Sequence, residues 1–315
     1  MKKIEKKKQI SVVTPCFNEE ENIDDVYKAI KKIRDNHLDY EWEHIFIDNC
    51  SVDKSLELLK GIAEKERTVK IIVNIRDFGH IRSHFYGYLA AEGDAVIPFL
   101  CDLQDPPELI NDFIKQWEDG YKVVVGVKNK SRENPFMFFI RKIYYSIMEN
   151  ISETDHIKNF TGFGLYDKSF LDIIRKLKDP YPYFRGLVAE YGQDRIEIPY
   201  TQRKRKKGKS KNSFYSLYDA GTHGLINHSK LPLRLASFFG FGSALVSFVV
   251  ALFYLIYKLI YWDSFQIGIA PIVIGLFFFS AVQLFFIGVI GEYVGAVFTQ
   301  TKNRPHVIEK ERINF

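Results

Sequence analysis

The sequence has few cysteines and lacks the glycine-rich signatures of common nucleotide-binding folds. Its three cysteines, Cys16, Cys50 and Cys101, are odd in number and widely spaced, which excludes a disulfide framework and a CxxC zinc site and suits a reducing compartment. No GxGxxG follows the first apolar run, and no GxxxxGK followed by Ser or Thr occurs. Neither a dinucleotide-dependent dehydrogenase nor a P-loop ATPase is therefore expected. The basic N-terminus also lacks the apolar core of a secretory signal.

Charge is nearly balanced, and apolar residues gather toward the C-terminus. The 315 residues include 44 Lys and Arg against 39 Asp and Glu, a net charge of +5, and 46% are hydrophobic, so a disordered chain is excluded. Two charge-free runs, Leu235–Tyr257 and Ser264–Gly291, contain 23 and 28 residues. About 20 apolar residues span a bilayer core, and core helices of soluble proteins rarely stay uncharged for so long. We therefore expect two transmembrane helices rather than two core helices.

Flanking charges predict the orientation of this hairpin. Only Lys258–Asp263 separates the two runs, so both ends of the chain should lie on one side of the bilayer. Lys230 and Arg234 precede the first run and four basic residues follow the second, whereas the loop contains Lys258 alone. The positive-inside rule then places both termini in the cytoplasm. We predict a multi-pass protein of the inner (cytoplasmic) membrane with its N-terminal region in the cytoplasm.

The N-terminal two-thirds alternates short β-rich runs with helical segments. The first helix is expected to begin at Asn18 as its cap, with Glu21 as the capping-box partner. The alternation predicts an α/β fold with a mostly parallel sheet. The predicted strands are Ile10–Thr14, His44–Asp48, Val69–Val73, Asp94–Leu100 and Lys122–Gly126. Ligands of such sheets bind beyond the carboxyl ends of the strands, where four polar segments occur: 15–19, 48–53, 76–80 and 102–105.

Two side chains after the fourth strand are candidate metal ligands. In an extended segment, residues two apart face the same way, so Asp102 and Gln104 would direct oxygens at one point. Hard oxygen ligands suit Mg²⁺ or Mn²⁺ that also holds substrate phosphates. The alternative is an ordinary loop in which Asp105 caps the helix after Pro106 and Pro107.

The order of these segments resembles a known family. The segments TPCFNEEENI, IDNCSVDKS, RDFGH and CDLQDPPE, followed by two apolar runs, are similar to the family 2 glycosyltransferases of the GT-A fold over essentially the whole chain. The similarity is greatest to the polyisoprenyl-phosphate glycosyltransferases, which include dolichyl-phosphate mannose synthase and the GtrB-like bacterial enzymes. The resemblance implies a GT-A domain that binds a nucleotide sugar and a polyprenyl phosphate.

The same resemblance implies roles for individual residues. Asp102 and Gln104 resemble the catalytic ligands of Mg²⁺ or Mn²⁺ that hold the donor diphosphate. The positions that resemble the donor pocket are Pro15, Asn18, Glu19, Asp48 and Arg76, with Gly79 in the same turn as Arg76. The positions that resemble contacts to the acceptor phosphate are Arg141, Arg205, Ser210 and Lys211.

Five positions depart from the family pattern. Leu100 replaces the first carboxylate of an Asp-x-Asp motif, Asn49 replaces an Asp, Asp77 replaces an Asn, and Gln202 replaces an Arg. Gly162 lies where many relatives have a candidate carboxylate base. A sugar hydroxyl needs such a base, but a phosphate monoester has a second pKa near ~6 and is already an anion at neutral pH. The missing carboxylate therefore favours a phosphate acceptor.

A basic run precedes the first apolar run. Residues 203–211 contain seven Lys or Arg without alternating aromatics, which favours binding to an anionic bilayer and a lipid phosphate over nucleic acid. A solvated loop is the alternative. The residues after this run are typical of an interfacial amphipathic helix. The expected division is a GT-A domain at 1–212, a juxtamembrane segment at 213–234, two transmembrane helices at 235–291 and a cytoplasmic tail at 292–315.

These features predict a membrane-anchored inverting glycosyltransferase. It would move a sugar from a nucleotide diphosphate sugar, with a UDP-sugar favoured, to polyprenyl phosphate, with undecaprenyl phosphate favoured, for cell-surface glycan synthesis. Two alternatives stay open: a glycosyltransferase that extends a polysaccharide on a hydroxyl group, and a non-catalytic membrane scaffold that binds lipid phosphate. No nucleic-acid partner is expected, and a homo-oligomer is compatible with the sequence.

Overall fold

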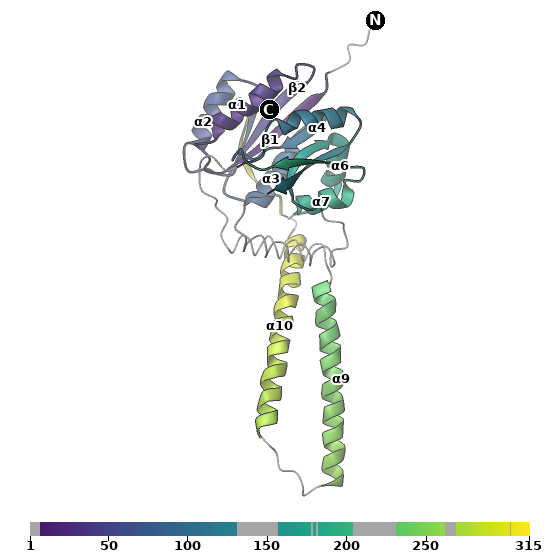
Figure 1. Ribbon diagram of the computed structural model, residues 1–315. Helices are drawn as coiled ribbons and strands as arrows, with labels where there is room; N and C mark the ends of the chain where they lie inside the picture. The colour runs from purple at the N-terminus through teal and green to yellow at the C-terminus, as the bar shows by residue number, and fades with distance from the viewer. Residues whose placement is uncertain are drawn as a thin grey trace. The chain divides into compact units, whose positions relative to one another are not determined.

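The computed structural model describes residues 7–130, 157–177, 179–180, 182–203, 231–261, 269–302 and 304–315. The chain divides into two compact units, Met1–Gly224 with Asn303–Phe315, and Leu225–Lys302. Figure 1 shows the first unit as layered strands and helices and the second as two long helices. The expected acceptor-phosphate residues lie outside the described residues: Arg141, Arg205, Ser210 and Lys211.

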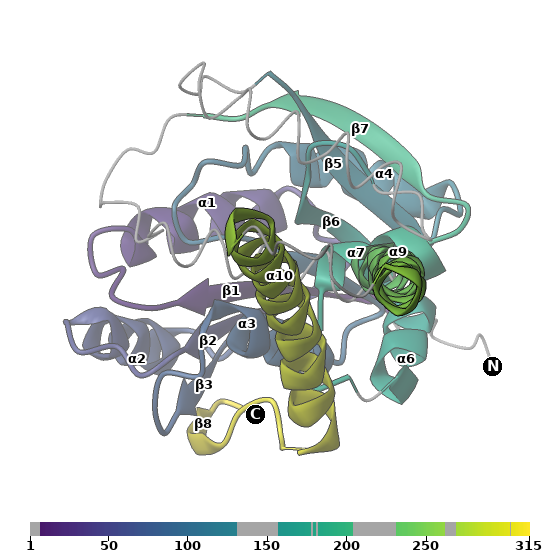
Figure 2. The same cartoon turned by 90° about the horizontal axis from the view of Figure 1, so that it is seen from below.

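One eight-stranded sheet forms the first unit, in the order β7-β5-β6-β4-β1-β2-β3-β8. The strands are β1 Gln9–Cys16, β2 Glu41–Asp48, β3 Val69–Asn74, β4 Ala95–Pro98, β5 Val123–Lys130, β6 Phe160–Asp167, β7 Ile196–Thr201 and β8 Glu309–Ile313. Strands β1 to β4 are parallel, as are β5 and β7, whereas β6 and β8 run antiparallel to their neighbours. Figure 2 shows β7 and β8 at opposite edges. The prediction of a mostly parallel α/β sheet is confirmed.

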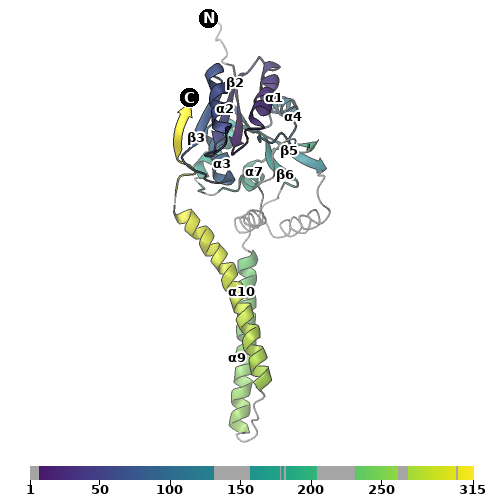
Figure 3. The ribbon, with the colours of Figure 1, turned by 90° about the vertical axis from the view of Figure 1, so that its left-hand side faces the viewer.

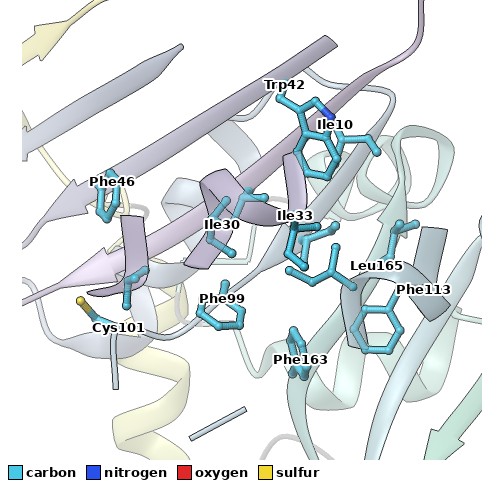
Figure 4. Close-up of a cluster of buried hydrophobic side chains, with 14 of the residues drawn as sticks. Ile10, Ile30, Ile33, Trp42, Phe46, Phe99, Cys101, Phe113, Phe163 and Leu165 are labelled. Atoms are coloured by element: carbon cyan, nitrogen blue, oxygen red, sulfur yellow. The ribbon is translucent and has the colours of Figure 1, made fainter. Parts of the chain in front are cut away.

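Helices cover both faces of this sheet. Side chains of α1 (Ile23–Asp35), α2 (Ser55–Lys65) and α4 (Leu109–Glu118) join one buried apolar cluster, part of which Figure 4 shows. Those of α3 (His80–Ala90), α6 (Lys168–Leu177) and α7 (Phe184–Tyr191) join another. Val12 belongs to the first cluster and Val13 to the second, because successive residues of a strand face opposite sides. The strands are therefore continuous apolar runs, as expected for a sheet covered on both faces.

The expected cap of the first helix is wrong. Helix α1 begins at Ile23 after Asn22, and no side chain caps it. Asn18 has a φ of 53°, in the left-handed region that Asn tolerates better than most residues. Its side-chain oxygen accepts a hydrogen bond of 2.8 Å from the backbone N–H of Val52. Asn18 therefore links the loop after β1 to the loop after β2.

The last residues of the chain add an edge strand to the sheet. Strand β8 pairs antiparallel with β3, with Ile313 opposite Ile71, and Figure 3 shows the two side by side. The side-chain amide of Asn314 donates to the backbone oxygens of Ala63 and Val69 at 2.8 Å each. The strand covers an edge of β3 that would otherwise present unpaired backbone groups. The segment expected as a tail thus contributes to the first unit.

The second unit contains α9 (Leu231–Ile260) and α10 (Ile269–Thr301). The two helices contact each other, and the rings of Phe239 and Phe286 stack with centroids 5.9 Å apart. Among the described residues, one stretch, Phe278–Thr301, is long and apolar enough to cross a membrane. Large apolar side chains on both helices are exposed, including Phe238 at 83% and Leu284 at 69%.

Candidate active site

An open pocket of about 1000 Å³ lies beyond the carboxyl ends of the parallel strands. Each of the first four strands is followed by a segment that lines it, represented by Glu19, Asn49, Asp77 and Asp102. This is the position that the topology of a parallel α/β sheet predicts for a ligand. We call it the donor pocket, and its described lining contains three carboxylates and no Lys or Arg.

The structure brings some of the expected donor residues together and not others. Pro15, Glu19, Gly79 and Asp102 line the donor pocket. The other expected residues do not line it, within the described part of the chain: Asn18, Asp48, Arg76 and Gln104. The exposed Arg76 guanidinium lies over the ring of Phe78, 4.0 Å from its centroid, and donates to the backbone oxygen of Asp77. The expected residues that line the pocket therefore lie at the end of β1 or in the segments that follow β1, β3 and β4.

Hydrogen bonds connect the loops that carry these residues. The backbone N–H of Glu19 donates to Ser55 Oγ at 2.9 Å, and that of Asn18 donates to Ser51 Oγ at 3.0 Å. One oxygen of Asp48 accepts from the N–H of Ser51 at 3.2 Å. The loop after β1 is therefore held against the start of α2 and the loop after β2, which limits how far the wall of the donor pocket can move.

Asp48 lies fully buried at the end of β2. Its Oδ1 atom has no hydrogen-bond partner among the described residues. Burial raises the pKa of this carboxyl above its usual value, although the bonds from Ser51 and the backbone of Cys50 oppose the shift. A buried acceptor without a partner costs free energy, and Asp48 does not line the donor pocket.

An amide and a carboxylate connect the loops after β2 and β3. The amide of Asn49 donates to Asp77 Oδ1 at 2.5 Å, and that same oxygen accepts from the N–H of Gly79 at 2.7 Å. Asn49 in turn accepts from the amide of Asn74 at 2.9 Å and from the N–H of Phe78 at 3.1 Å. Asn49 and Asp77, two positions expected to depart from the family pattern, therefore pair with each other.

The expected geometry of Asp102 and Gln104 is wrong. The chain turns at Cys101 and Asp102 instead of staying extended, and Leu103 has a φ of 52°. Asp102 Oδ1 accepts from the backbone N–H of Gln104 at 3.1 Å, a short-range bond typical of Asp in turns. The rule that residues two apart face the same way does not hold in a turn. Asp102 lines the donor pocket and Gln104 does not.

The pocket fits a divalent cation that is shared with a ligand. Within the described residues, no group of three or more His, Cys, Asp or Glu side chains is close enough to hold a metal ion. Mg²⁺ is commonly bound by one or two carboxylates, with phosphate oxygens and water completing the octahedron. Asp102 offers one such carboxylate at the mouth of the sheet. Since Leu100 has no oxygen in its side chain, more of the coordination would have to come from the ligand.

Strand β7 holds the loop after Asp102 from the other side. Asp105 is buried, and Tyr200 donates to its Oδ1 at 2.5 Å. The backbone N–H of Arg203 donates to the Gln104 oxygen at 2.8 Å, and its guanidinium pairs with Glu108. Asp105 is not the helix cap that the alternative interpretation required, because α4 begins at Leu109 after Glu108. The first residue of the basic run is thus attached to the Asp102 loop.

A second hollow, of about 840 Å³, adjoins the donor pocket and shares His80, His84 and Leu100 with it. We call it the side pocket; α3, the start of β6 and the start of α7 line it, with Arg185 as the cation. The rings of His80 and His84 lie edge to face, 6.0 Å apart. Burial, reinforced by the charge of His80, lowers the pKa of His84 to about 3, so its imidazole is neutral near pH 7.

His80 and His84 were not among the site residues predicted from the sequence. The available signal was their spacing of four residues directly after the turn at Gly79, which places both on one face at the start of a helix. Gly162 also lines the side pocket with a φ of 101°, and a Cβ there would meet only Phe184, at 3.8 Å. A side chain at residue 162 would therefore have room, although its backbone conformation favours glycine.

Comparison with known proteins agrees with this geometry. Residues 11–174 match the family model described as glycosyl transferase family 2. The chain is 31% identical over 304 residues to the uncharacterized glycosyltransferase YkcC of Bacillus subtilis, covering 96% of this chain and 94% of the relative. It is 30% identical to the SfII prophage-derived bactoprenol glucosyl transferase of Shigella flexneri, covering 96% of this chain and 98% of the relative.

The protein is therefore a glycosyltransferase. It belongs to glycosyl transferase family 2, and the family predicted from its four motif segments is confirmed. Among solved structures, glucosyl-3-phosphoglycerate synthase from Mycobacterium tuberculosis with UDP is 17% identical, with a TM-score of 0.48, over 70% of this chain and 78% of that chain.

Proposed function

We propose that this protein transfers a sugar from a nucleotide diphosphate sugar to a polyprenyl phosphate at a membrane. The observation that carries the proposal is the extent of the similarity to a bactoprenol glucosyl transferase, 30% identity over 96% of this chain. The family match itself ends at residue 174, so the wider similarity includes the helices α9 and α10. Shared C-terminal helices favour a shared lipid-linked acceptor over a soluble one.

The donor would bind in the donor pocket. Pro15 and Glu19 line it, and Asn18 links the loop that forms its wall to the loop after β2. Asp48 and Arg76 do not line the pocket and stay proposed donor contacts on the resemblance alone. We propose a UDP-sugar as the donor.

Asp102 would hold Mg²⁺ or Mn²⁺ against the donor diphosphate, whereas Gln104 does not line the pocket and is no longer proposed as a ligand. When bound, the cation would act as a Lewis acid that stabilises the charge on the departing diphosphate. The loop that carries Asp102 is attached to β7 through Tyr200 and Arg203. This attachment would keep the carboxylate in place while the substrates bind.

Transfer needs no base in this proposal. An oxygen of the acceptor phosphate attacks the anomeric carbon, the bond from that carbon to the diphosphate oxygen breaks, and the nucleoside diphosphate leaves with the electron pair. A phosphate monoester with a second pKa near ~6 is already an anion at neutral pH, so no proton is removed. Attack opposite the leaving group inverts the anomeric configuration. The proposed contacts to the acceptor phosphate are Arg141, Arg205, Ser210 and Lys211.

We further propose that α9 and α10 both span the inner membrane, with both termini in the cytoplasm. Each helix contains a long charge-free run, and each exposes large apolar side chains such as Phe238 and Leu284. Water disfavours such surfaces, and a lipid bilayer covers them. The anchor would hold the enzyme at the leaflet that contains the acceptor, which we propose to be undecaprenyl phosphate.

A donor panel tests the proposal. Membranes containing the protein are incubated with labelled UDP-, GDP- and dTDP-sugars, Mg²⁺ and undecaprenyl phosphate, and lipid products are separated by thin-layer chromatography. We expect one donor to give a lipid-linked monosaccharide that mild acid hydrolyses. Membranes with Asp102→Asn serve as the control. Label that appears only in polysaccharide would favour the hydroxyl-acceptor alternative, and an absence of label with every donor would favour the scaffold.

A further inference from the structure

The side pocket differs chemically from the donor pocket that it adjoins. The donor pocket is lined by Glu19, Asp77 and Asp102, whereas the described lining of the side pocket contains no carboxylate and one guanidinium, that of Arg185. An anion entering the donor pocket without a cation would meet three negative charges. The same anion in the side pocket would meet a positive charge in a partly buried setting, where the attraction is stronger than in water.

Arg185 is available to a ligand. The residue is half-buried at the start of α7, and its guanidinium lies 5.2 Å from the centroid of the Tyr183 ring. Among the described residues it forms no ion pair. The Tyr183 ring therefore orients the guanidinium without neutralising it, and five N–H groups remain to bind an oxyanion.

The remaining walls of the side pocket are apolar and neutral. The apolar lining residues include Ile81, Phe85, Tyr88, Pro182 and Phe184. His84 is neutral because burial lowers its pKa to about 3. A phosphate monoester of an isoprenoid alcohol combines a dianion with a branched hydrocarbon two bonds away. One cation beside aromatic and aliphatic walls matches that combination, whereas a sugar ring would require several polar partners.

We propose that the side pocket binds the phosphate head and first isoprene unit of the acceptor, with Arg185 as a phosphate-binding residue in addition to the basic residues proposed above. This inference rests on the proposed function and deepens it. The two pockets adjoin, because both are lined by His80, His84 and Leu100. A phosphate bound in the side pocket would therefore lie next to a donor bound in the donor pocket. Gly162 leaves the side pocket without a negative charge at that position, where a carboxylate would compete with the phosphate for Arg185.

Binding to the full chain in detergent tests the assignment. The probes are geranyl phosphate, geraniol, inorganic phosphate and UDP with Mg²⁺, and the variants are Arg185→Gln, Arg185→Lys and Arg67→Gln. Arg67 is an exposed arginine before β3, at the opposite end of the strands. Loss of a charged hydrogen bond typically weakens binding by roughly tenfold to hundredfold, so we expect that loss for geranyl phosphate with Arg185→Gln.

The other expected results separate charge from folding. UDP affinity should stay within about twofold in all variants, Arg185→Lys should retain part of the affinity for geranyl phosphate, and Arg67→Gln should behave as wild type. Geraniol and inorganic phosphate should each bind more weakly than geranyl phosphate, because each lacks half of the recognised group. An unchanged affinity for geranyl phosphate in Arg185→Gln, or a weakened affinity for UDP, would overturn the assignment.

A matched pair at Gly162 gives a second test. Asn and Asp have the same shape and both tolerate positive φ better than other side chains, so Gly162→Asn controls for strain. We expect Gly162→Asp to weaken geranyl phosphate binding at least about fivefold more than Gly162→Asn, because like charges repel. Equal effects would contradict an anion site beside residue 162.

Failure of the proposed function would look different. If wild-type protein binds geranyl phosphate through Arg185 but transfers no sugar to undecaprenyl phosphate, the proposed function is wrong and the binding site stands. If wild-type protein transfers sugar and Arg185→Gln leaves the KM for undecaprenyl phosphate unchanged, the proposed function stands and the side pocket is not the acceptor site.

Discussion

The donor pocket and the side pocket meet at the same histidines but are built differently. The donor pocket takes its walls from loops that directly follow β1 to β4, and those loops are connected by hydrogen bonds such as Asn49 to Asp77. The side pocket takes its walls from α3, β6 and α7, which are far apart in sequence, and most of them are apolar. The two pockets thus differ in charge and in origin: the donor pocket has three carboxylates on connected loops, and the side pocket has one guanidinium and no carboxylate in its described lining.

The two proposed ligands would account for this difference. A nucleotide diphosphate presents many polar groups in known positions, so a rigid set of hydrogen-bonding loops can recognise it at little entropic cost. A lipid phosphate presents one anionic group and a hydrocarbon chain, for which a cation and apolar walls suffice. We therefore expect substitutions in the donor pocket to affect chemistry and stability, and those in the side pocket to affect acceptor binding.

The largest expected effect comes from the carboxylate of the donor pocket. Asp102→Asn keeps the shape of the side chain but removes the charge that would hold the cation. We expect kcat to fall by about 10²–10³-fold, the range seen when one electrostatic contact to a transition state is lost, while the melting temperature changes little. Initial rates of sugar transfer to undecaprenyl phosphate measure this.

Asp119→Asn is the matched control, because Asp119 is an exposed carboxylate at the end of α4. It should transfer sugar at the wild-type rate. Activity of the wild-type enzyme that survives EDTA unchanged would refute the metal role and remove the main chemical contrast between the two pockets.

An intermediate effect is expected from the paired amide and carboxylate of the donor pocket. Asn49→Asp places a second carboxylate against Asp77 and removes a hydrogen-bond donor, which should cost about 1–3 kcal/mol of unfolding free energy. The double variant Asn49→Asp, Asp77→Asn restores one donor and one acceptor. Its thermal stability should return most of the way to that of the wild type, which differential scanning fluorimetry in detergent measures at pH 8.

The single variant Asp77→Asn completes the cycle. Additive losses in Asn49→Asp, Asp77→Asn and the double variant would show that the two residues do not interact, and the connected loops of the donor pocket would then not depend on this contact.

The smallest expected effect concerns His84, which both pockets share. Burial lowers its pKa in the folded chain to about 3 from the ordinary value of 6.5, so below about pH 6.5 the unfolded chain binds a proton that the folded chain does not. Stability is therefore retained above that pH and lost as pH falls toward 3, by at most about 1.4 kcal/mol per pH unit. The melting temperature of His84→Gln should therefore fall less between pH 6.5 and pH 5 than that of the wild type.

His44 also contributes to this slope. Burial lowers its pKa to about 3, so the His84→Gln variant keeps part of the wild-type slope. If His84→Gln has the full wild-type slope, His84 is not a group that folding keeps neutral.

Much of the donor pocket could be predicted from the sequence. The apolar runs that end at Thr14, Asp48, Val73 and Leu100 predict parallel strands, and the polar segments after them predict the ligand edge. The pattern of residue types does not place side chains that lie outside these segments. His80 and His84 follow a recognisable turn, but only the folded chain places the exposed His80 and the half-buried His84 in the lining of both pockets.

The sequence by itself determined the α/β architecture and the side of the sheet where ligands bind, because alternating apolar runs and βαβ handedness leave few other arrangements. Only the tertiary structure decided how Asn49 and Asp77 pair, that Leu103 turns the chain so that Asp102 and Gln104 diverge, and that β8 closes the edge beside β3. Those features depend on contacts between residues distant in sequence or on single backbone angles. A periodic pattern of residue types predicts neither long-range contacts nor single backbone angles.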